Sequence, residues 1–235
     1  MNVHTLAERL WCDGYLHLEN FFDLDLMDRL HDLILAHYGP DPEHFHNQEF
    51  LSRAATEVIP WFPQRTNVAA FEEVAEHPSL CALTDAILGS GWHSQECMVM
   101  FSKPGSKGQA WHQDCPPDIP ERFNLNRLIY TEDVDPDNGG QVVVVPGSHR
   151  RGLLPVGAPH GDLPTQVTLQ PAKGSLVLLH GHAYHRVLPV GDRCRVSTNY
   201  RCVPQGTPLD ITDICVYRTM RYQFSTNRIV QERAS

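Results

Sequence analysis

The sequence lacks several features that mark common functional classes. None of its 235 residues lies in an uncharged apolar run of about 20, which argues against a transmembrane helix. Asp and Glu outnumber Lys and Arg by 28 to 19, and the net charge of −9 argues against nucleic acid or an anionic membrane surface as a partner. The phosphate-binding motifs GxGxxG and GxxxxGK[ST] are also absent. The acidic balance is also explained by solubility alone.

Cysteine is present without the spacing of a disulfide or zinc framework. The seven cysteines are an odd number and form no CxxC pair, so we expect free thiols. The opening stretch MNVHTLAERLWCDGY has neither the basic start nor the apolar run of a secretory signal. These observations predict a cytoplasmic protein. At this length and with an apolar fraction of 41%, residues 1–235 are expected to form one domain without a disulfide or structural metal.

The first part of the chain, residues 1–90, is predicted to be mainly helical. Apolar residues recur at helical spacing after Asp23 and Asp25, either of which can cap a helix that ends before Gly39. The predicted elements are helices over 5–12, from 23 or 25 to 37, and over 72–88, a strand over 14–19, and a loop over 41–66.

From residue 91 onward, short apolar or alternating segments are separated by turn residues. Glycines 139, 140 and 147 are expected at turns that require positive φ. A series of short strands predicts a mainly β fold, an antiparallel jelly roll (a cupin-like double-stranded β-helix) over 91–203, with the N-terminal helices packed on one face. Residues 204–235 form a C-terminal extension in which 213–222 fit either a strand or a short helix. The predicted strands cover 96–102, 110–113, 125–131, 141–145, 165–169, 175–180, 186–189 and 195–202.

One short motif has the composition of a metal site. In Trp111-His112-Gln113-Asp114, the His and the Asp are two residues apart at a predicted strand end, so both face the same side and Gln113 faces the other. An imidazole and a carboxylate on one face are two of the three ligands in the 2-His-1-carboxylate triad of non-haem Fe(II) enzymes. Because the chain has fourteen histidines, this pair alone is a weak signal.

Two features further along the chain strengthen the prediction of a metal site at His112 and Asp114. The predicted strand over 174–180 leads into HGHAYH (180–185), in which three histidines compete to be the third ligand. Ten residues after His185, Arg195 opens another strand. A metal that chelates a dicarboxylic 2-oxo acid needs a fixed cation for the far carboxylate, and the planar guanidinium of arginine suits that role.

These residues lie in four longer segments: GYLHLENFFDLDLMDRL, FSKPGSKGQAWHQD, DVDPDNGGQVVVVPGSHRRG and GSLVLLHGHAYHRVLP. Together with Arg195 they span residues 14–203 and resemble the phytanoyl-CoA dioxygenase (PhyH) family of Fe(II)- and 2-oxoglutarate-dependent oxygenases. The resemblance implies a double-stranded β-helix that uses Fe(II), 2-oxoglutarate and O2. It also implies that His112, Asp114 and His185 are the iron ligands and that Arg195 binds the distal carboxylate of 2-oxoglutarate.

The resemblance also ranks the competing histidines. The distal ligand of the family lies near the start of the strand pair that ends in the arginine, which favours His185 over His180. In the family the PGSH segment shapes a turn, so we interpret His149 as a turn residue. His44 and His46 lie in a predicted loop and are interpreted as solvated or lid-associated side chains that bind no metal.

Further contacts of 2-oxoglutarate are predicted from strand alternation. Arg193 directly follows a Gly-Asp turn, which points it to solvent and favours Arg195 as the anchor. Ser197 lies two residues after Arg195 and can add a hydroxyl to the same carboxylate. The family often has a polar residue two positions after the distal histidine, where this chain has Val187.

The strand that follows the His-Asp motif supplies two more candidates. Asn126, Leu128 and Tyr130 share one face of that strand. If this face is interior, Tyr130 can hydrogen-bond 2-oxoglutarate and Asn126 can contact the substrate.

The predicted reaction is the hydroxylation of a C–H bond in a small organic substrate, with release of succinate and CO2. Desaturation and ring closure use the same oxidant, whereas halogenation is disfavoured because halogenating relatives have a small residue where this chain has Asp114. Two alternatives remain: a cupin-type metal enzyme that uses no 2-oxoglutarate, and a non-catalytic metal- or ligand-binding barrel. Residues 40–66 and 150–165 are the expected lid segments.

Overall fold

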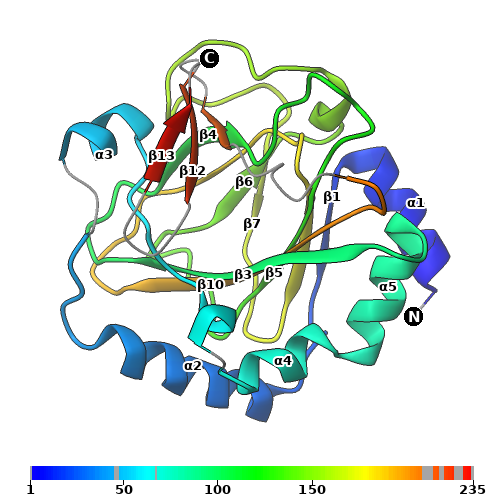
Figure 1. Cartoon of the computed structure of the whole chain (residues 1–235). Helices are drawn as coiled ribbons and strands as arrows, with labels where there is room; N and C mark the ends of the chain where they lie inside the picture. The colour runs from blue at the N-terminus through cyan, green and yellow to red at the C-terminus, as the bar shows by residue number, and fades with distance from the viewer. Residues whose placement is uncertain are drawn as a thin grey trace.

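Two antiparallel sheets stack face to face, and helices cover the outer side of one of them (Figure 1). The computed structural model describes residues 2–44, 48–66, 68–207, 214–216, 220–224 and 230–233, with side chains as far as residue 207. The first sheet has the order β1 (Tyr15–Leu18), β8 (Leu176–His180), β5 (Leu125–Ile129), β10 (Arg195–Val203), β3 (His93–Ser102) and β2 (Ile59–Trp61). The second has the order β13 (Val230–Arg233), β12 (Met220–Phe224), β11 (Ile214–Val216), β4 (Gln109–Gln113), β9 (His185–Val187), β6 (Val142–Val144) and β7 (Val167–Leu169).

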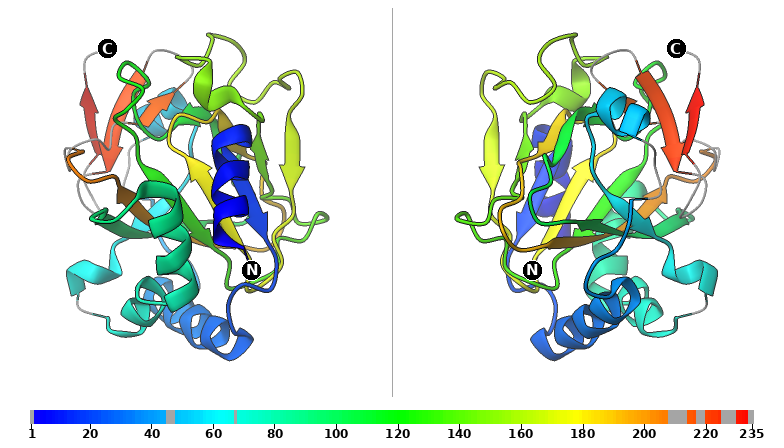
Figure 2. Two further views of the ribbon diagram at one scale, coloured as in Figure 1. Left: turned by 90° about the vertical axis from the view of Figure 1, so that its right-hand side faces the viewer. Right: turned by 90° about the vertical axis from the view of Figure 1, so that its left-hand side faces the viewer.

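The helices are placed mainly before the long strand β3. They are α1 (Val3–Asp13), α2 (Leu24–Tyr38), α3 (Gln48–Ala54), α4 (Ala70–Ala75) and α5 (Pro78–Leu88), with short 3-10 turns over Pro63–Thr66 and Ser148–Arg150. Asp23 caps α2 by accepting hydrogen bonds from two backbone N–H groups of the first turn, and the helix ends at Gly39 as predicted. Figure 2 shows from two sides that α2 and α4 lie at one end of the molecule and the C-terminal strands at the other.

Strand alternation divides the apolar side chains between two cores. In β5 and β8, one set of side chains faces the helices and the other faces the second sheet. The outward set includes Leu125, Ile129, Leu176 and Leu178; the inward set includes Leu128, Tyr130, Val177 and Leu179. The side chains of even-numbered residues in β5 therefore reach the interior between the sheets, and this meets the condition under which Asn126 and Tyr130 were named as candidates.

The eight strands predicted between residues 91 and 203 are all present, and the fold is the predicted double-stranded β-helix. The three turn glycines have positive φ, between 69° and 77°. The six cysteines with described side chains are free thiols. The side chain of Cys215 is not among those that the structure describes. Within the described part of the chain, no helix has the length and apolar composition needed to cross a membrane.

Two predictions for the N-terminal part are wrong. The expected loop over 41–66 contains α3, β2 and a 3-10 turn, because buried side chains such as Ala54 and Ile59 pack this segment against the sheets. The expected helix over 72–88 is two helices that break before Pro78. Proline has no N–H to donate and its ring disfavours a preceding helical turn, so it starts α5 instead of continuing α4.

The C-terminal extension adds strands to the sheet that contains β4. The part of 213–222 that the structure describes is strand, which decides between the two predicted forms. β11 pairs with β4 at His112 and Gln113, so the extension borders the strand of the His-Asp motif.

The turn at Gly139 provides a test of the jelly-roll connections. At φ +77°, a Cβ added here would lie 2.1 Å from the carbonyl oxygen of Pro189, whereas a Cβ at Gly105, at φ +75°, would meet nothing within 4 Å. Both alanine variants adopt a left-handed conformation that costs about 1–2 kcal/mol, and only Gly139→Ala adds a steric clash. We expect urea denaturation to show a clearly larger loss of unfolding free energy for Gly139→Ala than for Gly105→Ala. Equal losses would contradict the close approach of the two loops.

Candidate metal centre

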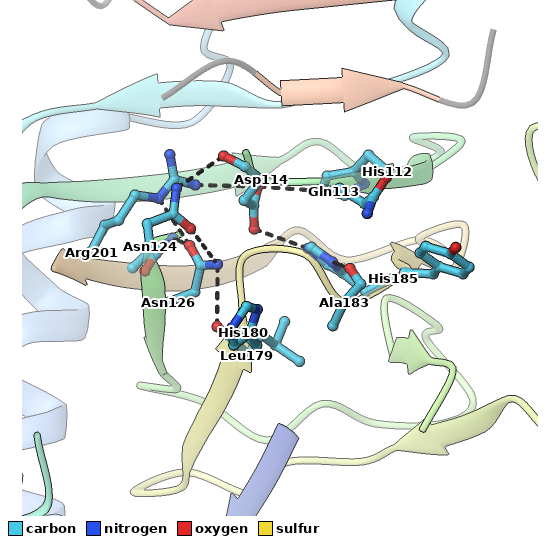
Figure 3. A network of polar contacts seen from close by, with 12 residues as sticks. His112, Gln113, Asp114, Asn124, Asn126, Leu179, His180, Ala183, His185 and Arg201 are labelled. Carbon is cyan, nitrogen blue, oxygen red and sulfur yellow. Dashed lines mark hydrogen bonds and ion pairs between the residues drawn. The ribbon is translucent and has the colours of Figure 1, made fainter. Parts of the chain in front are cut away.

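Three of the predicted site residues converge between the sheets. His112 is in β4, Asp114 follows that strand directly, and His185 begins β9, where it pairs with His112 in register. Nε2 of His185 lies 3.2 Å from Oδ2 of Asp114, and Nε2 of His112 lies 3.8 Å from Oδ1 (Figure 3). One donor atom from each of the three buried residues lies within 4.8 Å of the others. In the part of the chain that is described, this is the His/Cys/Asp/Glu group that could hold a metal ion.

Backbone contacts fix both histidine rings in the form that a metal needs. Nδ1 of His112 lies 2.7 Å from the carbonyl oxygen of Ala110, and Nδ1 of His185 lies 2.9 Å from that of Ala183. A carbonyl oxygen only accepts, so Nδ1 carries the proton and the lone pair is on Nε2. Burial and the nearby His185 lower the pKa of His112 to about 4. The ring is therefore neutral near pH 7 and its Nε2 can donate to a metal.

A buried arginine holds the carboxylate of Asp114. Nη2 of Arg201 lies 3.2 Å from Oδ1 of Asp114, and Nη1 lies 3.1 Å from Oε1 of Glu96. Nε of the same guanidinium donates to Oδ1 of Asn126 at 2.9 Å. Arg201 is only 2% exposed, so these contacts form away from solvent. Each of its three nitrogens thus has a partner, and the planar group is fixed in one orientation.

Arg201 determines which oxygen of Asp114 remains available. Burial alone would raise the pKa of Asp114, but the proximity of His185 and Arg201 outweighs burial and lowers it. The group is thus an ionised, acceptor-only carboxylate. Because Arg201 contacts Oδ1, Oδ2 is the oxygen that faces His185.

Gln113 faces away from the two candidate ligands, as strand alternation predicted. Its Nε2 donates to the carbonyl oxygens of Gly152 and His182 at 3.0 and 2.9 Å, and its Oε1 accepts from the N–H of Leu154 at 2.9 Å. One fully buried amide therefore links β4 both to the loop that precedes His185 and to the segment 152–154.

Arg195 is the second buried arginine of β10. Its Nε donates to the carbonyl oxygen of Gly140 at 2.9 Å, and its Nη1 donates to Oγ of Ser197 at 2.8 Å. The guanidinium lies over the ring of Tyr130, 5.7 Å from its centroid. Unlike Arg201, Arg195 forms no ion pair with a carboxylate of the described residues, although it is only 3% exposed.

A cavity of about 40 Å³ connects the metal centre with Arg195. Its polar wall includes both arginines, and its apolar wall comes from several strands. The lining residues are Thr56, Val58, Met98, Met100, Gln109, His112, Asp114, Leu128, Val142, His185, Val187, Arg195, Ser197, Asn199 and Arg201. The predicted lid segment 40–66 contributes Thr56 and Val58. The segment 150–165 does not line the cavity, but Gly161 accepts a hydrogen bond from the indole of Trp111 at 2.6 Å.

The two candidates Asn126, in β5, and Tyr130, just after it, lie behind the cavity wall. Tyr130 is fully buried below Arg195, and its hydroxyl has no hydrogen-bond partner of good geometry among the described residues. Asn126 does not line the cavity. Its Oδ1 accepts from Asn199 at 2.7 Å as well as from Arg201, so the amide supports the cavity wall instead of facing the substrate. The expectation that Asn126 contacts the substrate has no support in this geometry.

The competing histidines lie elsewhere. His180 has the parity that points away from the interior, and its ring stacks on Phe123 at 4.3 Å. His149 is in a 3-10 turn, as expected for a turn residue, and its Nε2 lies 3.2 Å from the carbonyl oxygen of Trp11. His44 is not among the cavity residues, and His46 lies outside the described residues. Arg193 is exposed and pairs with Asp135, in agreement with its predicted solvent position.

Sequence reasoning missed Arg201 and Asn199. Both continue the alternation that begins at Arg195 and Ser197, so four side chains of β10 face one cavity. Extending that period along the strand would have found them.

Comparisons with known proteins identify the family and the fold of the chain. The family model for phytanoyl-CoA dioxygenase (PhyH) matches residues 10–190, and the chain therefore belongs to that family. A comparison with curated protein sequences finds no match. Among solved structures, SnoN, a non-haem α-ketoglutarate-dependent epimerase from nogalamycin biosynthesis, is 21% identical with a TM-score of 0.68, over 89% of this chain and 87% of that chain.

Two other solved structures share the fold. HygX from Streptomyces hygroscopicus, solved with nickel and 2-oxoglutarate bound, is 14% identical with a TM-score of 0.67, over 85% of this chain and 87% of that chain. ThoJ, a non-haem monooxygenase, is 17% identical with a TM-score of 0.61, over 90% of this chain and 79% of that chain. At these identities the likeness establishes the fold.

The Arg201 contacts generate a prediction about metal affinity. We expect Arg201→Met to weaken Fe(II) binding about 10–100-fold, the range typical when a partner of a metal ligand is lost, and Arg201→Lys to weaken it less because a cation remains. Anaerobic calorimetric titration measures the affinity. Arg29→Met removes an exposed ion pair with Glu73 and serves as the control that keeps wild-type affinity. Equal affinity in wild type and a folded Arg201→Met variant would rule out a role for Arg201 in positioning Asp114.

Proposed function

We propose that this chain is an Fe(II)- and 2-oxoglutarate-dependent oxygenase that oxidises a C–H bond of a small organic substrate, most simply by hydroxylation. The observation that carries the proposal is the position of Arg195. It is a buried cation that forms no ion pair among the described residues, although its charge acts against the burial that raises the pKa of Glu132. It faces the same cavity as the His-Asp-His group. A buried unpaired charge is costly, so its presence is explained by an anionic ligand in the cavity.

The donor set supports Fe(II) as the metal. His112 and His185 offer two neutral imidazole nitrogens and Asp114 offers one carboxylate oxygen, which is the donor set of the facial triad in non-haem iron oxygenases. Such a triad leaves three coordination positions for other ligands. We assign these three residues as the iron ligands of the chain.

The residues around Arg195 support 2-oxoglutarate as the anion. Arg195 and Ser197 would bind the distal carboxylate, and the Tyr130 hydroxyl lies nearby without a partner of good geometry among the described residues. The methylene carbons of the ligand would contact Leu128, Val142 and Val187, which line the cavity and pack in the same apolar cluster as Tyr130. The polar contact that the family often places at the Val187 position is thus replaced by an apolar one.

Iron(II) with 2-oxoglutarate supplies oxidation by O2, in which 2-oxoglutarate is converted to succinate and CO2. The chain's own residues would orient this chemistry: His112, Asp114 and His185 would hold the metal, Arg201 fixes the carboxylate of Asp114, and the remaining cavity wall would exclude water. The structural relatives include an epimerase and a monooxygenase, so the same fold serves more than one reaction. Hydroxylation is the outcome that we propose here.

A small organic substrate is supported by what the relatives bind. SnoN was solved with nogalamycin RO and HygX with hygromycin B. The substrate would enter beside Thr56 and Val58, which come from the one predicted lid segment that lines the cavity.

The free thiols fit the expected cytoplasmic location.

The two arginines at 193 and 195 provide a matched test of the cosubstrate. When the Fe(II)-loaded protein is titrated anaerobically with 2-oxoglutarate, we expect the weak visible charge-transfer band of a bidentate chelate. Arg195→Met should raise the apparent Kd about tenfold or more, because the loss of a charged hydrogen-bond partner costs about 1.5–3 kcal/mol. Arg193→Met, which changes an exposed ion pair, should leave it unchanged. Iron binding without any band in the wild type would favour the cupin-type alternative.

A further inference from the structure

Two methionines face the metal centre from β3. Met98 and Met100 share one side of the strand and both line the cavity that contains His112, Asp114 and His185. Met98 is only 3% exposed. No other sulfur atom is present among the residues that line this cavity. The proposed function assigns neither thioether a role in binding the metal or 2-oxoglutarate.

The strand register places the two methionines at different ends of the cavity. Met100 pairs with Ser197, whose hydroxyl accepts from Arg195 and marks the proposed distal end of 2-oxoglutarate. Met98 pairs with Asn199, one step along the same face toward Arg201, which contacts Asp114. A ligand that extends from the metal to Arg195 would therefore lie along Met100. Met98 is the thioether nearer to the metal end.

The other apolar groups of the cavity are less easily oxidised. Val58, Leu128 and Val142 offer only C–H bonds, whereas a thioether sulfur has a lone pair that accepts an oxygen atom to give a sulfoxide. An oxidant produced in this cavity without a substrate would thus meet Met98 as the most reactive side chain near the metal end.

We infer that Met98 is a self-oxidation site of the enzyme. The inference rests on the proposed function and applies to turnover in the absence of substrate. One molecule each of O2 and 2-oxoglutarate and one thioether give succinate, CO2 and methionine sulfoxide. One oxygen atom of O2 enters the new carboxylate of succinate and the other forms the S–O bond. 2-Oxoglutarate and the sulfur each supply two electrons, which together reduce O2.

Oxidation of Met98 by the enzyme's own turnover would inactivate the enzyme. Met98 belongs to a buried apolar cluster with Ala110, Trp111 and Val143, which supports the strand of His112. A sulfoxide is polar and larger than a thioether, so it would disturb both this packing and a cavity of about 40 Å³. Substrate that fills the cavity would protect Met98 by taking the oxygen atom itself.

Peptide mass spectrometry of the full chain tests the inference. The Fe(II)-loaded protein is incubated with 2-oxoglutarate and ¹⁸O₂ and with catalase, without substrate, and succinate is measured in the same sample. Trypsin releases residues 66–107, which contain Met98 and Met100, and residues 10–29, which contain the core residue Met27. We expect ¹⁸O on Met98 at about ten times the level seen without 2-oxoglutarate, and no increase on Met27. The label should be lost in Asp114→Ala and Met98→Leu and should persist on Met98 in Met100→Leu.

The outcomes separate this inference from the proposed function. Succinate without labelled Met98 would overturn the inference and leave the oxygenase assignment intact. A chelate band without succinate would also overturn it, because turnover would then require substrate. Equal label on Met98 without 2-oxoglutarate would assign the oxidation to stray peroxide and reject self-oxidation. If neither band nor succinate appears, the proposed function itself fails, and the inference fails with it.

Discussion

A carboxylate buried between two β-sheets stays ionised only when cations and hydrogen-bond donors surround it. Asp114 meets this condition through Arg201, which is itself buried and needs acceptors for its remaining N–H groups. Glu96 and Asn126 supply them from β3 and β5. The single carboxylate thus requires a network of polar contacts that crosses several strands, and the geometry of the candidate metal centre depends on that network.

The two buried arginines of β10, Arg195 and Arg201, have different kinds of contact. They are six residues apart and share one face of the strand, so both reach the cavity. Arg201 contacts the carboxyl groups of Asp114 and Glu96, whereas Arg195 contacts only neutral groups, a carbonyl and a hydroxyl. The first arginine orients the candidate metal ligand, and the second is the residue that we propose to bind the anion. One period-2 pattern therefore supplies both halves of the proposed site.

Local patterns in the sequence predicted what depends on neighbouring residues. Strand alternation predicted that His112 and Asp114 face one way and Gln113 the other, and the turn glycines were predicted at their positive φ values. What failed depends on distant segments. Arg201 became relevant only because β10 lies beside β5 and β3, and α3 forms because its apolar residues meet the sheets. The choice of His185 over His180 came from the family resemblance and not from spacing alone.

The two alternatives to an oxygenase explain the buried charged residues to different extents. A barrel without catalytic function would be more stable with apolar side chains in place of two buried arginines and a buried aspartate, because such charges cost desolvation energy. A cupin-type metal enzyme would explain His112, Asp114 and His185, and it would also explain Arg201, which serves the metal carboxylate. It gives no reason to bury Arg195 beside Ser197 without an ion-pair partner among the described residues. The argument for a 2-oxo acid therefore depends on that one arginine more than on the metal ligands.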